Sequence, residues 1–244
     1  MHYVMSDIHG NKEAFDKILS MICLQPEDHL YILGDVIDRG KHGIELLQQI
    51  RRLENCTLLM GNHEFMMVDA LRNPDDYDAM DLWESQHSEH TLYAFDKLTS
   101  PEQEDLLCYL EHLPFQIEVT VRHRKYILVH AAPQELYEHK NAKDYELKYF
   151  MVWHRLRKDS VMPPGKYVIF GHTPVCKISP AFYRSMHIYH GNRMIAIDCA
   201  SGFPQYGGQL GCIRLEDMTE FYSDDGVLTK QEAEAQLKRK DEFI

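Results

Sequence analysis

The sequence has no apolar run that approaches the ~20 residues of a membrane-spanning helix. Nor does it begin with a basic segment followed by an apolar stretch, because residues 1–5 already have the pattern of a strand, so we expect no secretory signal. Its six cysteines are scattered and form no Cys-x-x-Cys pair, which is typical of reduced thiols and not of a zinc site or a disulfide framework. We therefore expect a cytoplasmic protein without a membrane partner.

Positive charge is also scarce. The chain has 26 lysines and arginines against 38 aspartates and glutamates, which gives a formal net charge of −12 and argues against a general nucleic-acid binder. Residues 122–125 form the one compact basic run, and they stand between two strand-like runs, so we expect a solvated hairpin turn there. We expect no nucleic-acid partner.

The chain has no linker, internal repeat or low-complexity segment, so we expect one domain over residues 1–244. Its first part repeats the order strand, polar loop and helix three times, with the strands at residues 1–5, 29–33 and 56–60. This order predicts an α/β fold with parallel strands, in which a site lies beyond the carboxyl ends of the strands.

Two segments do not follow the repeated order of strand, polar loop and helix. Residues 73–101 are acidic and predict a helical insertion or a lid over the sheet, although plain packing explains them equally well. Residues 223–244 form a tail, and the charged pattern of residues 230–240 predicts a helix. The other expected strands are residues 116–121, 125–129, 167–170, 186–189, 193–197, 210–215 and 219–222.

Side chains that can bind metals or phosphate follow five of the apolar strands, and small residues or proline flank each cluster. The clusters are Asp7 with His9, Asp35 with Asp38 and Arg39, Asn62 with His63, His130, and His172. One histidine after a strand is more often structural than a ligand. Five such clusters in one chain, all at carboxyl ends of strands, favour a shared site.

The residue types in these clusters indicate the chemistry. Mixed oxygen and nitrogen ligands suit Mn, Fe or Zn and not a thiolate site. An aspartate such as Asp35 can share one oxygen between two metal ions that lie ~3.5–4 Å apart. The planar guanidinium of an arginine binds phosphate with two parallel hydrogen bonds. A histidine oriented by a carboxylate can protonate a leaving oxygen. Together these features predict a metal-dependent reaction at phosphorus.

The motifs that carry this pattern resemble those of a known family. They are Ser-Asp-Ile-His-Gly (6–10), Gly-Asp-Val-Ile-Asp-Arg-Gly (34–40), Gly-Asn-His-Glu (61–64), Val-His-Ala (129–131) and Gly-His-Thr-Pro (171–174). They are similar to motifs of the calcineurin-like metallophosphoesterase superfamily, in particular to bacterial and phage serine/threonine phosphatases of the phosphoprotein phosphatase family. Symmetrical diadenosine tetraphosphatases are related to this group. The resemblance implies a calcineurin-like β-sandwich of two mixed sheets flanked by helices.

The resemblance also implies a role for each residue. Asp7, His9 and Asp35 would bind one metal ion, and Asp35, Asn62, His130 and His172 would bind the other. His63 would be the general acid, oriented by Asp38. Arg39 would bind phosphate, and Arg155 in Trp-His-Arg (153–155) would be a second phosphate-binding arginine, with nearby Arg157 as the alternative. Hydroxide that bridges the two ions would attack the substrate directly, without a phosphoenzyme.

Three functions follow as hypotheses. The first is a dinuclear-metal phosphatase of phosphoserine and phosphothreonine in proteins, with manganese as the expected metal and iron or zinc as alternatives. The second is hydrolysis of a nucleotide phosphoanhydride such as diadenosine tetraphosphate, or of another phosphorylated small molecule. The third is an inactive scaffold, which the presence of every ligand type and of His63 disfavours.

Overall fold

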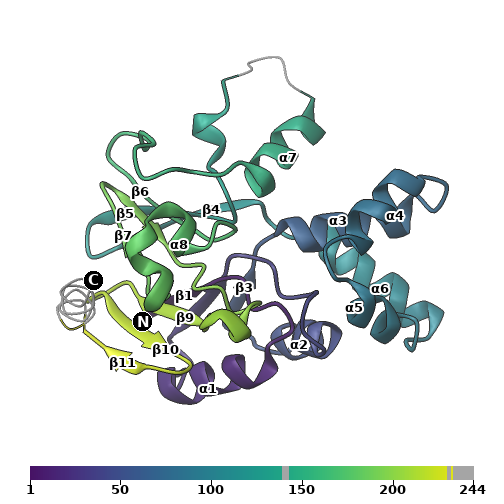
Figure 1. The fold of residues 1–244 in the computed structure, drawn as a ribbon, viewed down its shortest axis with the longest axis horizontal. Coiled ribbons are helices and arrows are strands. Elements are labelled where there is room, and N and C mark those ends of the chain that lie inside the picture. The colour runs from purple at the N-terminus through teal and green to yellow at the C-terminus, as the bar shows by residue number, and fades with distance from the viewer. Residues whose placement is uncertain (139–142, 230–231, 233–244) are drawn as a thin grey trace.

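The computed structural model of the protein describes residues 1–138, 143–229 and 232. In these residues the chain forms two mixed β-sheets with helices around them, as the resemblance implies (Figure 1). None of the helices in the described part of the chain is long and apolar enough to cross a membrane.

The first sheet has the strand order β11-β10-β9-β1-β2-β3. Its first three strands in the sequence are parallel, and β9, β10 and β11 join the edge of β1 in antiparallel register. The strands are β1 (His2–Met5), β2 (His29–Ile32), β3 (Cys56–Leu58), β9 (Gly211–Arg214), β10 (Thr219–Tyr222) and β11 (Gly226–Leu228). The parallel part confirms the expected strand–loop–helix repeat.

The second sheet has the order β4-β5-β6-β8-β7. Three central strands are parallel, and antiparallel strands stand at both edges. The strands are β4 (Gln116–Val121), β5 (Arg124–Val129), β6 (Tyr167–Phe170), β7 (Tyr189–His190) and β8 (Met194–Ala196). Residues 122–123 connect β4 to β5 as a two-residue hairpin, which confirms the turn expected in the basic run.

Helices complete the layers. They are α1 (Lys12–Ile22), α2 (Gly43–Ile50), α3 (Asn62–Arg72), α4 (Tyr77–Glu84), α5 (Glu89–Phe95), α6 (Ser100–Glu111), α7 (Asp144–Trp153) and α8 (Val175–Ile178). Some begin where the sequence offers a start signal: the Asn11 side chain accepts the Ala14 N–H at the start of α1, and a proline stands in the first turn of α6.

Two hydrophobic cores follow from the alternation along the strands. In β1, Val4 packs between the two sheets, whereas Tyr3 and Met5 pack on the side of the helices. Successive side chains of a strand point to opposite faces, so a nearly continuous apolar strand supplies both cores. Trp83 and Phe95, from the acidic segment 73–101, belong to the core on the helix side. The expected insertion is therefore helical, and it is packed into this core instead of standing apart as a lid.

Two expectations about secondary structure need correction. The strand expected at residues 186–189 is displaced, because β7 begins only at Tyr189 and a 3₁₀ helix over Pro180–Arg184 precedes it. The expected helical tail, residues 223–244, contains β11, which pairs with β10. Apart from residue 232, the charged segment 230–240 lies outside the described residues.

Candidate metal and phosphate site

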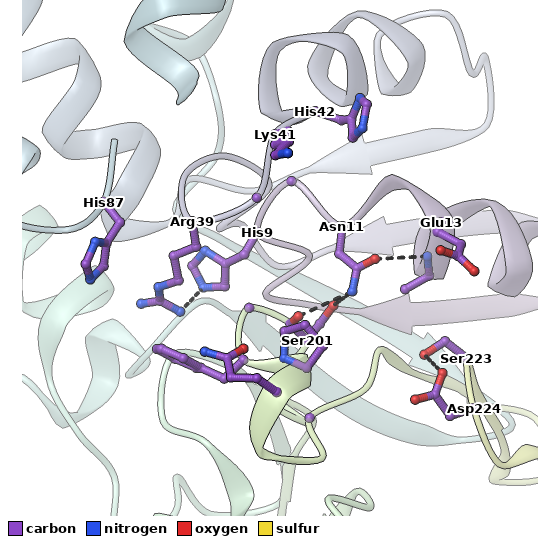
Figure 2. A pocket seen from close by; sticks show the side chains of 18 of the residues that line it. His9, Asn11, Glu13, Arg39, Lys41, His42, His87, Ser201, Ser223 and Asp224 are labelled. Atoms are coloured by element: carbon purple, nitrogen blue, oxygen red, sulfur yellow. Dashed lines mark hydrogen bonds between the residues drawn. The ribbon is translucent and has the colours of Figure 1, made fainter. Parts of the chain in front are cut away.

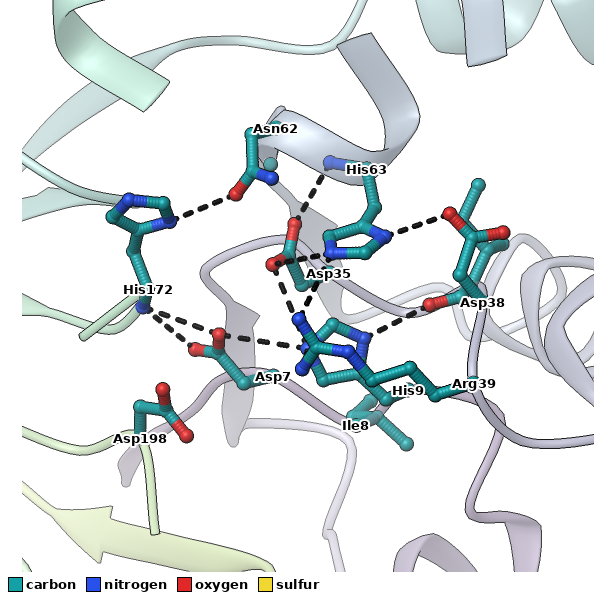
Figure 3. Close-up of polar contacts among 12 residues, drawn as sticks. Asp7, Ile8, His9, Asp35, Asp38, Arg39, Asn62, His63, His172 and Asp198 are labelled. Carbon is teal, nitrogen blue, oxygen red and sulfur yellow. Dashed lines mark hydrogen bonds and ion pairs between the residues drawn. The ribbon is translucent and has the colours of Figure 1, made fainter. Parts of the chain in front are cut away.

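The proposed ligands follow β1, β2, β3, β5 and β6, with Asn62 in the first turn of α3 and the others in loops, so both sheets contribute to one site (Figure 3). Backbone hydrogen bonds join the first two loops. The amides of Asp7, His9 and Gly10 donate to the carbonyls of Gly34 (3.1 Å), Asp35 (2.9 Å) and Val36 (2.7 Å), respectively. These bonds continue the pairing of β1 with β2 past the sheet edge and fix the spacing of the polar side chains.

Six of the proposed site residues have left-handed backbone conformations that are uncommon outside glycine. Their φ angles are +56° at Asp7, +51° at His9, +55° at Asp35, +67° at Asp38, +65° at Arg39 and +61° at His172. His9 Nε2 lies 3.9 Å from Asp7 Oδ1. A turn with left-handed backbone, and not an extended strand, brings these two side chains together.

Asp35 lies between two groups of histidines. Its Oδ2 is 3.6 Å from His9 Nε2 and 3.8 Å from His63 Nε2, whereas its Oδ1 is 3.4 Å from His130 Nε2. The potential ligand atoms of Asp35, His9 and His63 lie within 4.8 Å of one another, and so do those of Asp35, His130 and His172. The group with His9 and His63 is called the first half of the site, and the group with His130 and His172 is called the second half. The Asp35 carboxylate therefore faces both halves.

The second ring nitrogen of each proposed histidine ligand contacts a backbone carbonyl oxygen. His9 Nδ1 lies 3.1 Å from Ile37 O, His130 Nδ1 lies 2.7 Å from Leu33 O, and His172 Nε2 lies 3.1 Å from Trp153 O. A carbonyl can only accept, so these contacts assign the proton to that nitrogen and leave the other nitrogen with a free lone pair. Such a support for the imidazole is typical of metal-binding histidines.

His63 differs, because its Nδ1 donates to the carboxylate Oδ2 of Asp38 (2.7 Å). Both side chains are buried, at 1% and 0% exposure. A carboxylate in this position keeps the His63 Nε2 facing the site and stabilises an imidazolium. Burial raises the pKa of Asp38 to about 7 and lowers the pKa of His63 to about 4. This contact with a carboxylate distinguishes His63 from the three histidines whose second ring nitrogen contacts a backbone carbonyl.

Three free lone pairs converge in the second half of the site. Asn62 Oδ1 lies 2.9 Å from His130 Nε2 and 2.8 Å from His172 Nδ1, the two nitrogens that carry no proton in this arrangement. Acceptors that face one another across such distances repel unless a cation lies between them. Burial and the charge of Asp35 also raise the pKa of Asp7 to about 8, and burial raises that of Asp35 to about 7. The donor set therefore fits bound metal cations.

Arg39 lies across the first half of the site. Its Nη1 donates to His9 Nε2 (2.6 Å), its Nη2 donates to His63 Nε2 (3.2 Å), and its guanidinium carbon is 4.6 Å from the centre of the Phe203 ring. A pocket of about 590 Å³ opens beside it (Figure 2). The lining includes Asn11, Lys41, His42, His87 and Ser201. The arginine thus stands between the candidate ligands and a space that a substrate can enter.

Arg155, the second arginine expected to bind phosphate, lies next to a candidate ligand. Its Nη1 donates to the backbone carbonyl of His172 (3.2 Å) and to Thr173 Oγ1 (3.4 Å), and the side chain is exposed. The described hydrogen bond of Arg157 is one from its backbone amide to Ser160 Oγ (2.9 Å). The geometry favours Arg155 over Arg157.

Sequence reasoning missed two buried carboxylates of this site. Glu64 Oε2 accepts the amides of Asp35 (2.8 Å) and Gly61 (3.2 Å), and its Oε1 accepts those of Val36 (2.8 Å) and Ile37 (3.3 Å). The signal for this role was its position three residues after Gly61, where a glutamate reaches back to the start of a helix. Asp198 lies beside Asp7 in Figure 3, and the signal for this position was its place directly after the strand expected at residues 193–197.

Comparison with known proteins agrees with this geometry. A family model described as calcineurin-like phosphoesterase matches residues 3–176. Serine/threonine-protein phosphatase 2 of Escherichia coli (strain K12) is 33% identical over 132 residues, which are 53% of this chain and 57% of that protein. A symmetrical bis(5'-nucleosyl)-tetraphosphatase of Baumannia cicadellinicola subsp. Homalodisca coagulata is 29% identical over 132 residues, which are 53% of this chain and 41% of that protein.

The chain thus spans about half the length of the curated relatives that it matches. Among solved structures, that of a protein provisionally named a diadenosine tetraphosphatase has a TM-score of 0.59 at 15% identity and covers 91% of both chains. At this identity the likeness shows the fold alone, and it agrees with the two mixed sheets flanked by helices.

Proposed function

Because the chain belongs to the calcineurin-like phosphoesterase family, we propose that it is a metal-dependent hydrolase of phosphoric monoesters. Its proposed substrates are phosphoserine and phosphothreonine in proteins, in line with the name of its relative from Escherichia coli. The observation that carries the proposal is the place of Asp35, whose two oxygens face two separate histidine groups. A carboxylate in that place can bind two metal ions at once.

Two divalent ions suit the donor set. Asp7, His9 and Asp35 would hold the first ion, and Asp35, Asn62, His130 and His172 would hold the second. Bound there, the ions would supply the positive charge that activates water and stabilises the phosphate oxygens. Nitrogen and oxygen donors without a thiolate support manganese, with iron and zinc as alternatives. The scattered cysteines continue to favour a cytoplasmic location.

The other residues act on the substrate. In this proposal the guanidinium groups of Arg39 and Arg155 bind the phosphate oxygens, and both arginines stand beside candidate ligands. The His63 Nε2 faces Asp35 and gives its proton to the leaving oxygen, while Asp38 stabilises the charged imidazole. These roles separate one histidine for acid catalysis from three for metal binding.

A comparison of two substrates tests the proposed specificity. The alternative, hydrolysis of diadenosine tetraphosphate, is supported by the symmetrical tetraphosphatases among the relatives. We expect kcat/KM to be higher for a phosphoserine peptide than for the dinucleotide. A preference for the dinucleotide above ~100-fold, which is about 2.7 kcal/mol of differential transition-state binding, would show that the protein-phosphatase proposal is wrong.

Reconstitution of metal-free protein with Mn, Fe, Zn or Mg tests the cofactor. We expect activity on a phosphomonoester to return with manganese and, to a smaller extent, with iron or zinc. The stoichiometry of bound metal at full activity should be two ions per chain. A chain that binds two ions and hydrolyses neither a phosphopeptide nor the dinucleotide would be the inactive scaffold.

A further inference from the structure

The helical segment over α4 and α5 makes two buried hydrogen bonds to Asp38. Trp83 Nε1 donates to Asp38 Oδ2 (3.0 Å), and the backbone amide of Asp38 donates to Thr91 Oγ1 (3.0 Å). All three residues are at most 1% exposed. Asp38 Oδ2 is also the atom that accepts the His63 Nδ1–H at 2.7 Å. The helical segment therefore contacts the same carboxylate oxygen that orients the proposed general acid.

The backbone at this position needs external support. Asp38 and Arg39 are consecutive residues with left-handed φ angles of +67° and +65°. Such conformations cost of order 1–3 kcal/mol each and persist only where surrounding contacts enforce them. Thr91 binds the amide of Asp38, and the carbonyl of His87 binds the amide of Arg39 (2.9 Å). Both supporting groups come from the turn between α4 and α5 or from α5 itself.

Trp83 makes a hydrogen bond that hydrophobic packing alone would not require. Its ring is fully buried in the core on the helix side, where a phenylalanine would also be apolar and aromatic. Only the indole N–H can donate to the carboxylate. Removal of this donor leaves Asp38 Oδ2 with His63 as its remaining donor among the described residues. The carboxylate then has freedom to rotate, and His63 rotates with it.

We propose that Trp83 and Thr91 are positioning residues for the proposed reaction, which fix Asp38 so that His63 Nε2 points at the leaving oxygen. The inference rests on the proposed hydrolysis of phosphomonoesters. In that step the oxygen of water forms a new bond to phosphorus, and the bond between phosphorus and the leaving oxygen breaks. The proton of His63 Nε2 passes to the leaving oxygen, the attacking water releases one proton to solvent, and His63 regains a proton from solvent.

The leaving group provides a readout that a merely structural role would not change. Phenolate is a poor leaving group that needs the proton of His63, whereas 4-nitrophenolate leaves with little help. For Trp83→Phe we expect kcat on phenyl phosphate to fall at least ~10-fold more than kcat on 4-nitrophenyl phosphate, a part of the ~10²–10⁴ that general acid catalysis contributes. KM and the content of bound metal should stay as in the wild type.

Three further variants serve as controls. Phe95→Leu removes buried apolar volume from α5, so it should slow both substrates equally or not at all. Thr91→Ser keeps the hydroxyl that accepts the Asp38 amide, whereas Thr91→Val removes it, and only the valine should reproduce the leaving-group effect. The threonine pair also tests the inference if Trp83→Phe does not fold. Equal slowing of both substrates in Trp83→Phe and Thr91→Val would overturn it.

A second readout does not require activity. In protein loaded with the diamagnetic ion Zn²⁺ and labelled with ¹⁵N-histidine, we expect a protected Nδ1–H signal of His63, assigned by its loss in His63→Asn. The signal should broaden or exchange rapidly in Trp83→Phe and persist in Phe95→Leu. A signal unchanged in Trp83→Phe would overturn the inference. If the wild type hydrolyses neither phenyl phosphate nor 4-nitrophenyl phosphate, the proposed function fails, while this signal still decides whether Trp83 positions His63.

Discussion

At the scale of single residues, the site combines strained backbone with close contact between glycines. Gly10 and Gly40 lie so near each other that a Cβ on Gly10 would stand 2.6 Å from the Gly40 carbonyl carbon. The residues beside them, His9 and Arg39, have left-handed φ angles, as does Gly10 itself. The glycines permit the close approach, and the functional residues bear the strain. Strain of this kind is typical of functional sites, where neighbouring contacts enforce it.

His63 contacts a carboxylate, whereas the other site histidines contact backbone carbonyls, and this difference predicts the effect of substituting His63. In His63→Asn we expect both metal ions to remain, because the carbonyl-supported histidines and Asp35 are unchanged. The value of kcat on a phosphomonoester should fall at least ~100-fold, the usual contribution of general acid catalysis. Metal analysis and steady-state kinetics check both parts, and turnover like that of the wild type would remove His63 from the mechanism.

Glu64 predicts an effect on stability. Both of its oxygens accept backbone amides, so either orientation of a glutamine would point its NH₂ group at two N–H donors. We expect Glu64→Gln to lower the free energy of unfolding by at least ~2 kcal/mol, since buried hydrogen bonds to a charged group are lost. Urea unfolding measures the change. Glu13→Gln, at an exposed position, should be neutral, and an equal loss in both variants would contradict the assigned role.

The sequence was informative about site residues that directly follow strands. It was uninformative about residues of distant helices that contact these site residues. Asp35 and His130 could be predicted because a polar residue directly after an apolar strand lies at the edge of a sheet. Trp83 is 45 positions away from Asp38, and no local pattern connects them. Such contacts depend on how helices pack over the sheet, so the structure was needed to find them.

At the scale of elements, boundaries were harder to predict than element types. Helix α3 begins at Asn62, so Asn62 and His63 occupy its first turn, whereas its apolar residues begin only at position 65. An apolar pattern starts later than the helix itself when the first turn carries functional polar residues. Strand β11 was missed for a different reason, because it is three residues long and, among the described strands, pairs with β10 alone at the edge of the sheet.

The hairpin between β4 and β5 predicts a stabilising substitution. Arg122 and His123 have φ angles of +46° and +69°, which a two-residue turn of this kind requires and which Asn-Gly adopts at lower cost. We expect the double substitution Arg122→Asn with His123→Gly to raise the free energy of unfolding by about 1 kcal/mol, measured by urea unfolding.

The same variant tests whether the basic run binds a substrate. The turn precedes β5, and His130 follows the other end of this strand, so the two are separated by the full length of six residues, roughly 20 Å. Unchanged kcat and KM on a phosphopeptide would agree with a solvated turn. A raised KM would instead assign the basic residues a part in binding.

At the scale of the whole molecule, the site joins the two sheets. Asp7, Asp35 and Asn62 follow strands of the first sheet, and His130 and His172 follow strands of the second. The sequence indicates that each residue lies at a strand end, but not that the ends of two different sheets meet. That meeting was expected only from the resemblance to a known fold. We infer from the core between the two sheets and from the shared site that residues 1–138 and 143–229 act as one domain.

Metal removal should therefore weaken the whole fold and not one half of it. Ions that bind only the folded chain stabilise it by RT ln(1 + [L]/Kd), about 2.7 kcal/mol for each site at a free concentration of 100 times Kd. Without the ions, burial and the charge of Asp35 raise the pKa of Asp7, so bound cations should stabilise this part of the fold. We expect one cooperative thermal transition in the metal-loaded protein and a transition at lower temperature after chelation, reversed by added Mn²⁺ or Zn²⁺.

The bridging position of Asp35 makes this prediction specific. Loss of a carboxylate that serves both ions should weaken both sites, so Asp35→Asn should show less than half of the wild-type shift in melting temperature on metal addition. His112→Gln, at an exposed position away from the site, should show the full shift. Two separate transitions in the metal-loaded protein would contradict a single domain. Full occupancy of both ions in Asp35→Asn, measured by metal analysis, would show that Asp35 does not bridge them.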